Sequence, residues 1–382
     1  MAAWVGSSPR CGPPQPWGRS CGRSRSPHVR QLDAVASRLL VNLTGQVPVL
    51  AGADQVAYLD IDDTIKATYG YQKEGAGYGY SKVKGLGALF GIISTPLSAP
   101  LIAAARLRKG STTSPKGASR LVADALATVK RAGVTGGITM RADSAYYNHD
   151  VIAAARRCGA RFWRHRPHGQ GRDQGNQPDP RRRLGGHQVP PARSTTRTSS
   201  GGCPTPRSPR SPSRRSRRAA RASTSLTRLI VRRVKRLGPK SAPAGQGELF
   251  SIWRHHAVFT DSAEPMLAAE ATHRDHAIVE QTFSDLKAGP LAHMPSGSFA
   301  ANSAWTVLAA IAFNLTRATG TLASKFHAKA TTATIRAQLI TVPARIAQSA
   351  RKIRIHLPQN WPWEHAWQIM FTAATGPPLP TT

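Results

Sequence analysis

Alternating apolar and polar positions predict two structured blocks, residues 29–163 and 226–358. In the first block, apolar runs of strand length lie at 56–62, 79–84, 89–95, 100–106 and 137–143. Apolar residues at helical spacing predict a helix over 118–132. A second helix is predicted over 149–158, because the Asn148 that precedes it is a good N-cap residue.

The second block contains fewer strands and longer helices. Its patterning predicts strands over 227–234 and 248–260, and helices over about 273–287 and 300–318. Strands, a helix, a strand, a helix and then late helices are typical of a mixed α/β layer fold.

Three stretches lack this patterning. Residues 1–28 and 164–225 are rich in Arg, Pro, Gly and Ser, and they hold too little apolar surface to offset chain entropy, so we expect disorder there. Residues 359–382 form a Pro-rich tail. The first two stretches contain no Lys and change abruptly into patterned sequence. Out-of-frame translation of a GC-rich gene would produce segments of this composition. A genuine basic linker rich in Arg and Ser is the alternative.

Charge is the main compositional feature. The 382 residues include 53 Lys and Arg against 19 Asp and Glu, a formal net charge of +34. Such an excess predicts a polyanionic partner and exceeds what an acidic substrate in a small cleft requires. Four scattered cysteines give no disulfide framework and no metal knuckle, so we expect a reduced, cytoplasmic setting. The longest apolar run, 305–315, is short for a membrane span, and the N-terminus lacks the apolar run of a signal peptide.

Acidic residues at two strand ends are the first candidates for chemistry. In the predicted strand over 56–62, alternation places Asp60 and Asp62 on one face and Asp63 on the other. Two carboxylates at a strand end need a compensating cation, and Mg²⁺ favours carboxylate oxygens together with substrate phosphates. An exposed acidic turn is the alternative. Asp143 ends another apolar strand and by itself is typical of a turn or cap residue.

The helix predicted over 273–287 carries a polar face. His273, His276, Glu280 and Lys287 fall within about 60° of one another around the helix, apart from its apolar face. One side would pack while the other lines up a carboxylate with cations that can bind phosphate. A solvated surface face is an equal alternative, and a zinc site from the two histidines and Glu280 is a further one.

Taken together, these motifs resemble the DDE transposases of bacterial insertion sequences. The phrases that carry the resemblance include YLDIDDT, KGLGALFGIIST, RLRKG, RADSAYY, GELFSIWRHHAVFTD and HRDHAIVEQTFSDLKAGPLAHMPSGSFAANSAW. They are most similar to the actinobacterial branch of the insertion-sequence family numbered 1380. The resemblance covers about 29–163 and 226–358.

The resemblance implies an RNase H-like catalytic core, a mixed sheet flanked by helices, here interrupted by a degenerate, disordered insertion. The expected organisation is a disordered basic N-terminus (1–28), the first part of the core (29–163), the insertion (164–225), remaining insertion strands and C-terminal helices (226–358), and a tail (359–382). Where the family has a longer N-terminal domain and a β-rich insertion, this chain has the Arg- and Pro-rich segments 1–28 and 164–225, which lack apolar periodicity. The resemblance therefore implies a truncated and internally frameshifted product.

The resemblance also implies the site. The catalytic, metal-binding acids fall on Asp62, Asp143 and Glu280, with Asp60 as a further metal ligand and the competing choice for the first acid. The implied cofactor is Mg²⁺, as two ions, with Mn²⁺ able to substitute. The wider superfamily has a Tyr and an Arg before the last acid, where this chain has His273 and His276.

DNA is the implied partner, as terminal inverted repeats and as target, bound by a homodimer in a synaptic complex in the bacterial cytoplasm near the nucleoid. No membrane is involved. Six basic side chains are implied in DNA binding: Lys287, His276, His273, Arg106, Arg108 and Lys109. For the last three, a solvated basic loop is the alternative.

Two other functions fit parts of the sequence. Asp60 and Asp62 also fit the Asp-x-Asp-x-Thr motif of haloacid-dehalogenase-type phosphatases, with Asp60 as nucleophile and Asp62 as acid/base. A non-catalytic, DNA-binding transposase remnant is the other alternative.

Overall fold

A computed structural model describes residues 27–69, 72–146, 148–165, 228–235, 253–262, 264–265, 275–349 and 352–376. The predicted disordered segments 1–28 and 164–225 lie outside these residues, except at their borders. Pro27 and His28 begin the first helix, and residues 164 and 165 end a strand.

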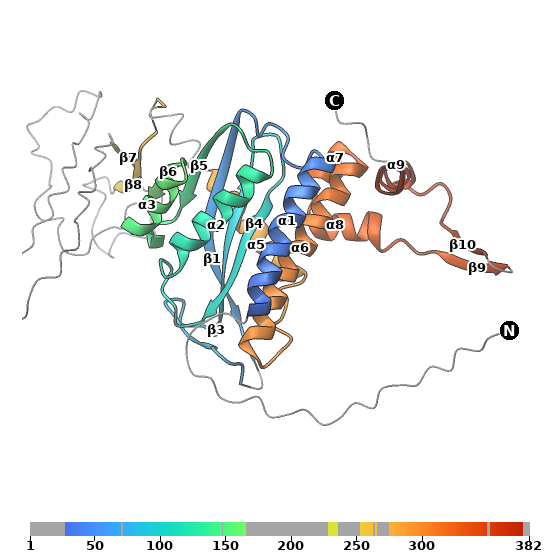
Figure 1. Ribbon diagram of the computed structural model, residues 1–382, viewed down its shortest axis with the longest axis horizontal. Helices are drawn as coiled ribbons and strands as arrows, with labels where there is room; N and C mark the ends of the chain where they lie inside the picture. Colours follow the sequence, from blue (N-terminus) through green and yellow to red (C-terminus); the bar gives the residue numbers. More distant parts are fainter. Residues whose placement is uncertain are drawn as a thin grey trace, which may run out of the picture.

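The first block folds into a sheet of antiparallel and parallel strands with helices between them (Figure 1). Its strands are β1 (Val56–Ala67), β2 (Gly77–Tyr78), β3 (Lys84–Ser94), β4 (Leu101–Lys109), β5 (Gly137–Ala142) and β6 (Arg161–His165). Its helices are α1 (Pro27–Gln46), α2 (Ala118–Arg131), the short 3₁₀ turn η1 (Ser144–Tyr146) and α3 (His149–Arg157). Two strands from the second block, β7 (Arg228–Lys235) and β8 (Trp253–Thr260), extend the sheet beyond β6.

The strand directions place β1 at the centre of the sheet. β1 pairs antiparallel with β3, which pairs antiparallel with β4, and on its other side β1 pairs parallel with β5. β5 then pairs parallel with β6, with α3 as the crossover. Three antiparallel strands, a helix and two parallel strands confirm the predicted mixed sheet flanked by helices.

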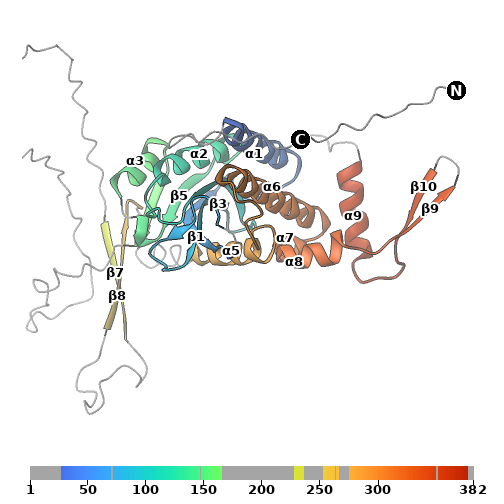
Figure 2. The same cartoon turned by 90° about the horizontal axis from the view of Figure 1, so that it is seen from below.

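The remaining helices follow the sheet. They are η4 (Asp275–Ala277), α5 (Ile278–Ala288), α6 (Phe299–Ala323), α7 (Lys325–Lys329), α8 (Thr332–Ile335), the π-helical turn η5 (Arg336–Ile340) and α9 (Glu364–Thr375). A two-stranded hairpin, β9 (Arg345–Ser349) and β10 (Lys352–His356), lies beside α9 at the end of the molecule away from β6 (Figure 2).

Helices cover both faces of the sheet, and strand alternation decides which side chains meet them. On β1, Ala57, Leu59 and Ile61 pack with α1, α2 and α3 in one buried cluster. On the opposite face, Phe90 and Ile92 of β3 pack with α5 and α6 in another. Figure 2 shows the strands between α2 and α3 on one side and α5 on the other.

Among the described residues, α6 is the one helix long and apolar enough, by length and composition, to cross a membrane. Its buried side carries Asn302, Asn314 and Arg317, each hydrogen-bonded inside the protein. Because helices buried in a protein core are also long and apolar, this arrangement is typical of a core helix.

Most predicted elements are present, with shifted ends. α2, α3, α5 and α6 lie where periodicity predicted helices, and the side chain of Asn148 caps α3 by accepting from the backbone of Asp150. The strand predicted over 79–84 is wrong, because Lys82 has a positive φ of 56° and the segment forms a turn. Strands require extended backbone, so this segment connects β2 to β3 instead.

Candidate active site

Two of the predicted acids lie on neighbouring strands, just beyond the point where the parallel pairing of β1 with β5 ends. β1 continues to Ala67, so Asp62 lies within the strand and not at its end as predicted. Asp62 is in β1, and Asp143 directly follows β5, the parallel neighbour of β1. The Asp62 side chain is partly buried, whereas Asp143 is exposed and one of its carboxylate oxygens accepts from the backbone N–H of Ser144. The fold therefore brings together two acids that are 81 residues apart in the sequence.

The environment of Asp62 disfavours a negative charge. Burial first, and then the nearby charges of Asp63 and Asp143, raise the pKa of the Asp62 carboxyl from 3.8 to about 6. A hydrogen bond from the backbone N–H of Asp63, 2.8 Å from Oδ1, and the imidazole of His276 act in the opposite direction. A cation at this position would relieve the cost of the charge.

The third predicted acid lies on a neighbouring helix. Glu280 is exposed in the first turn of α5, and Lys287 is exposed two turns further on the same face. The opposite face of α5 buries Val279, Phe283 and Leu286. The predicted division of this helix into a polar and an apolar face is therefore confirmed.

Asp60 has a different position from its neighbour Asp62. It is fully buried, and its carboxylate accepts two hydrogen bonds from the guanidinium of Arg141, Nε to Oδ1 and Nη2 to Oδ2, both 2.7 Å. His276 Nδ1 lies 2.7 Å from the same Oδ1. Because cationic and polar donors already bind both oxygens, the geometry contradicts the prediction that Asp60 is a metal ligand.

The same contacts bear on two other predictions. A phosphatase nucleophile must be open to its substrate, and Asp60 is not, so the haloacid-dehalogenase interpretation fails on geometry. The ring of His276, predicted to contact DNA phosphate, directs Nδ1 into the protein and is 18% exposed.

Asp63 projects to the other face of β1, as alternation predicted. It accepts hydrogen bonds from Arg108 and from the hydroxyl of Tyr146. Burial and the negative charge of Asp63 raise the pKa of the Tyr146 hydroxyl. The Arg108 guanidinium also donates to three backbone carbonyls, those of Thr113, Ser114 and Lys116. Arg108 is 6% exposed, so the prediction that it binds DNA is wrong, and it instead holds β4 and the following loop to β1.

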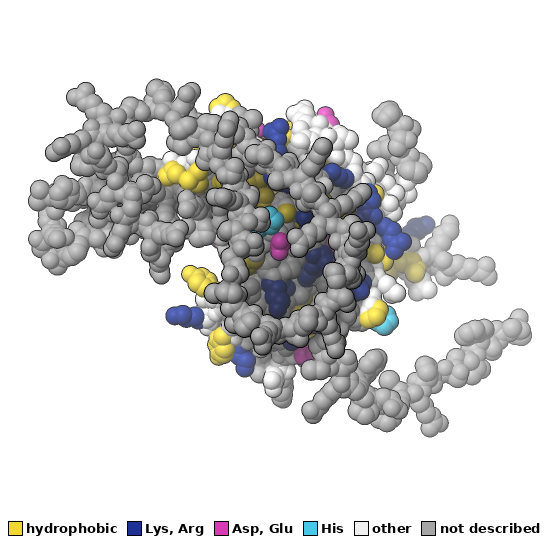
Figure 3. All heavy atoms as spheres, turned by 60° about the vertical axis from the view of Figure 1, so that its left-hand side comes forward, with side chains coloured by type: hydrophobic (Ala, Val, Ile, Leu, Met, Phe, Trp, Pro, Cys, Tyr) yellow, Lys and Arg dark blue, Asp and Glu magenta, His cyan; other side chains and the backbone are white. Residues whose placement is uncertain are grey.

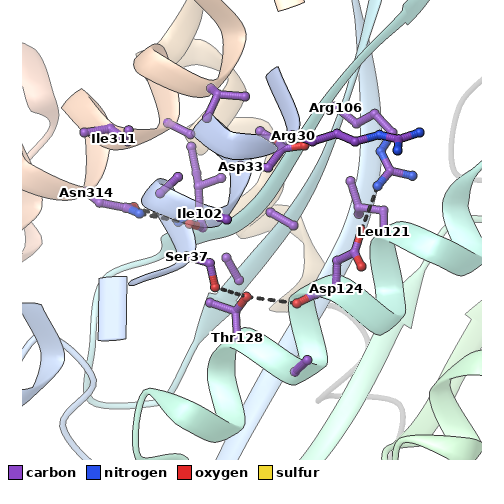
Figure 4. A pocket seen from close by; sticks show the side chains of 18 of the residues that line it. Arg30, Asp33, Ser37, Ile102, Arg106, Leu121, Asp124, Thr128, Ile311 and Asn314 are labelled. Carbon is purple, nitrogen blue, oxygen red and sulfur yellow. Dashed lines mark hydrogen bonds and ion pairs between the residues drawn. The ribbon is translucent and has the colours of Figure 1, made fainter. Parts of the chain in front are cut away.

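The other two residues of the basic motif on β4 differ from each other. Lys109 is exposed and remains a candidate for a phosphate contact. Arg106 lines a cavity of about 440 Å³ between α1, α2, β4 and α6, where it donates to Asp124 at 2.8 Å (Figure 4). Its predicted DNA contact thus competes with an intramolecular ion pair to the exposed side chain of Asp124.

Residues suited to hold a metal are only partly assembled. Within the described ranges, no group of three or more His, Cys, Asp or Glu side chains has the spacing of a metal site. Asp62 and Asp143 supply the oxygen donors that hard divalent cations prefer, and the raised pKa of Asp62 fits a cation there. His273, part of both the predicted DNA contact and the zinc alternative, lies outside the described residues.

Two functional candidates were missed by sequence reasoning. Arg141 and Tyr146 hydrogen-bond to Asp60 and Asp63, respectively, and the sequence alone predicts no contact for either. A signal existed for Arg141, because it precedes Asp143 by two residues and a strand places such residues on one face. No sequence signal pairs Tyr146 with Asp63.

The described surface carries more basic than acidic side chains on one face of the molecule. On the face drawn in Figure 3, Lys and Arg side chains recur over the described surface and acidic side chains are few. This distribution follows the net charge of +34 and suits a polyanionic partner.

Comparison with known proteins agrees with the transposase part of the resemblance. Residues 255–375 match the family described as "Transposase DDE domain group 1". This segment includes α5 and therefore Glu280 and Lys287. No curated protein matches the chain.

Similarity to solved structures is distant. A piggyBac transposase synaptic complex with hairpin DNA is 11% identical with a TM-score of 0.34, over 73% of this chain and 51% of that one. The Mos1 mariner paired end complex with Mn is 10% identical with a TM-score of 0.20, over 41% and 48%. The Mos1 strand transfer complex is 11% identical with a TM-score of 0.19, over 41% and 47%. The chain spans about half the length of these proteins.

Proposed function

We propose that this chain is a DNA transposase of the DDE class, which cuts and joins the ends of an insertion sequence. The observation that carries the proposal is the placement of Asp62, in the middle of β1, next to Asp143, which follows the end of the parallel strand β5, with the helix that carries Glu280 packed on the same sheet. The match of residues 255–375 to a transposase DDE domain supports it independently.

The three acids would act together as metal ligands. Asp62, Asp143 and Glu280 would hold two Mg²⁺ ions, and these would supply activation of the attacking hydroxyl and stabilisation of charge on the leaving oxygen. Asp62 is proposed as the first acid rather than Asp60, because only Asp62 is partly open to solvent. Lys287 and Lys109, both exposed, would contact DNA phosphates and so position the strand to be cut.

The wider setting is also part of the proposal. The DNA partners are terminal inverted repeats and a target duplex, bound by a homodimer in a synaptic complex in the bacterial cytoplasm. The finer family, the actinobacterial branch of the insertion-sequence family numbered 1380, is supported by the phrases quoted above. Its β-rich insertion would correspond to residues 164–225, and reading the gene there in a shifted frame should restore strand-like codons if frameshifting produced this segment.

A cleavage assay tests the function. Purified protein is incubated with Mg²⁺ or Mn²⁺ and a labelled duplex that carries the ends of the element. We expect metal-dependent nicking at the repeat end, abolished by Asp143→Asn. Asp150→Asn is the matched control, because it removes the same charge from an exposed residue on the adjacent helix α3.

The second candidate is a non-catalytic DNA-binding remnant. It is favoured by one observation, that Glu280 is exposed and the described acids form no three-residue metal site. A folded protein that binds the duplex in a salt-dependent manner, without cleavage under any divalent metal, would establish this alternative and refute the first.

A further inference from the structure

Three side chains that hydrogen-bond to one another, Asp60, Arg141 and His276, each precede one of the three proposed catalytic acids. Asp60 lies two residues before Asp62 on β1, and Arg141 lies two residues before Asp143 on the line of β5. His276 lies four residues before Glu280, in the 3₁₀ turn η4 that leads into α5. Two residues along a strand and four along a helix are the repeats that return a side chain to the same face.

The contacts within the cluster join all three elements. Asp60 and Arg141 are 0% and 1% exposed and face each other in the parallel register of β1 and β5. Their two 2.7 Å hydrogen bonds fix both the distance and the rotation of the guanidinium. The face of the Tyr58 ring lies 4.4 Å from the same guanidinium and limits its movement further.

His276 connects the helix to this strand pair. A carboxylate oxygen can only accept, so Nδ1 of His276 donates to Oδ1 of Asp60 over 2.7 Å. The next residue, Ala277, is the N-cap of α5 and supplies no side-chain hydrogen bond. The start of α5 is therefore attached to the sheet through the His276 side chain, one turn before Glu280.

We propose that Asp60, Arg141 and His276 form a positioning cluster that sets the relative placement of Asp62, Asp143 and Glu280. The inference rests on the proposed function, because it gives the cluster its purpose at the same site. The cluster residues do not touch the metal or the DNA. Each one fixes the backbone two residues along a strand, or four along a helix, before an acid. The opposite charges of Asp60 and Arg141 cancel, so the cluster adds no negative charge to the site.

His276 is the member best suited to a test. Replacing Asp60 or Arg141 would leave an unpaired buried charge and endanger folding. In His276→Ala the hydrogen bond that joins the start of this helical segment to β1 is lost, while the apolar packing of α5 on the sheet remains. In His276→Asn the hydrogen bond is kept, because the Asn amide nitrogen is attached to Cγ just as Nδ1 of His is. Gln281→Ala, at an exposed position of α5, is the matched control.

Three measurements are made on the full chain: Mn²⁺ affinity by electron paramagnetic resonance, hydrogen exchange of 278–288, and affinity for a DNA duplex. For His276→Ala we expect about 10–100-fold weaker Mn²⁺ binding, as for other residues that orient metal ligands. We also expect faster exchange in α5 and unchanged DNA affinity. His276→Asn should restore the Mn²⁺ affinity and the slow exchange in α5. Gln281→Ala should leave Mn²⁺ affinity, exchange and DNA affinity unchanged.

Two results would overturn the inference. One is α5 exchange and Mn²⁺ affinity in His276→Ala equal to those of the Gln281→Ala control. The other is a selective loss of DNA affinity in His276→Ala, which would make His276 a phosphate contact. Failure of the proposed function looks different, because the unaltered protein would then bind no Mn²⁺. Hydrogen exchange in α5 needs no metal and would still decide whether His276 holds the helix in place.

Discussion

Removing the charge of Asp62 should stabilise the metal-free protein at neutral and higher pH. Asp62→Asn keeps the shape of the side chain and the oxygen that accepts from the backbone of Asp63. It removes a negative charge from a partly buried position beside two other carboxylates, Asp63 and Asp143. The substitution therefore relieves an electrostatic cost without opening a cavity.

The magnitude follows from the pKa of Asp62, which is about 6 in the folded protein and 3.8 for an aspartate fully open to water. This difference corresponds to about 3 kcal/mol of folding free energy, as an upper bound for a group partly open to solvent. Folding favours the protonated form of Asp62, so this group does not lower the stability below pH 3.8. Its cost to stability grows as the pH rises from 3.8 and is complete above pH 6. At pH 8 the full cost is present, and at pH 5 about half of it remains.

Urea unfolding in EDTA at pH 8 and pH 5 measures the effect. We expect Asp62→Asn to be more stable than the unaltered protein by up to about 3 kcal/mol at pH 8, with about half that gain at pH 5. Asp54→Asn removes an exposed carboxylate and should show no such change with pH. An Asp62→Asn protein that is no more stable at pH 8 than at pH 5, relative to the unaltered chain, would refute the reasoning.

Three further predictions concern side chains that the fold gives a defined role. Arg108→Ala should destabilise the protein by about 3–5 kcal/mol in urea, because it leaves Asp63 without its buried partner; a loss of DNA affinity without loss of stability would contradict this. Asn314→Ala should cost about 1–3 kcal/mol, since the amide of Asn314 both accepts from and donates to the backbone of Ile102 on the edge strand β4; an unchanged urea midpoint would argue against it. Lys287→Ala should weaken DNA binding equally for all sequences and lower the slope of log affinity against log salt by about one, and a slope equal to that of the unaltered protein would exclude a phosphate contact.

Much of the fold could be predicted because it depends on local patterning. The apolar spacing of 118–132 is enough to specify an amphipathic helix, and Asn148 marks the start of α3 through its own side chain. The turn around Lys82 could not be predicted, because its apolar and polar pattern also suits a strand and only a positive φ of 56° excludes one. Helix α1 was not among the predicted elements, although Val29, Leu32, Ala36, Leu40 and Leu43 recur at helical spacing in the sequence.

The candidate site was predicted in its residue types but not in its pairings. Strand alternation correctly placed Asp60 and Asp62 on one face of β1 and Asp63 on the other. It could not distinguish Asp60 from Asp62, which differ in burial and not in local sequence. The basic motif on β4 also shows that local sequence does not predict burial. Arg108 is buried and bound to Asp63, whereas Lys109, the next residue, is exposed.

The sequence by itself determined the face on which each acid projects, because that depends only on the two-residue repeat of a strand and the 3.6-residue repeat of a helix. Tertiary structure alone decided which acid remains open to solvent. Arg141 is 81 residues from Asp60, and His276 is 216 residues from it. Pairings over such distances depend on the parallel register of β1 with β5 and on the packing of α5, and no local pattern records either.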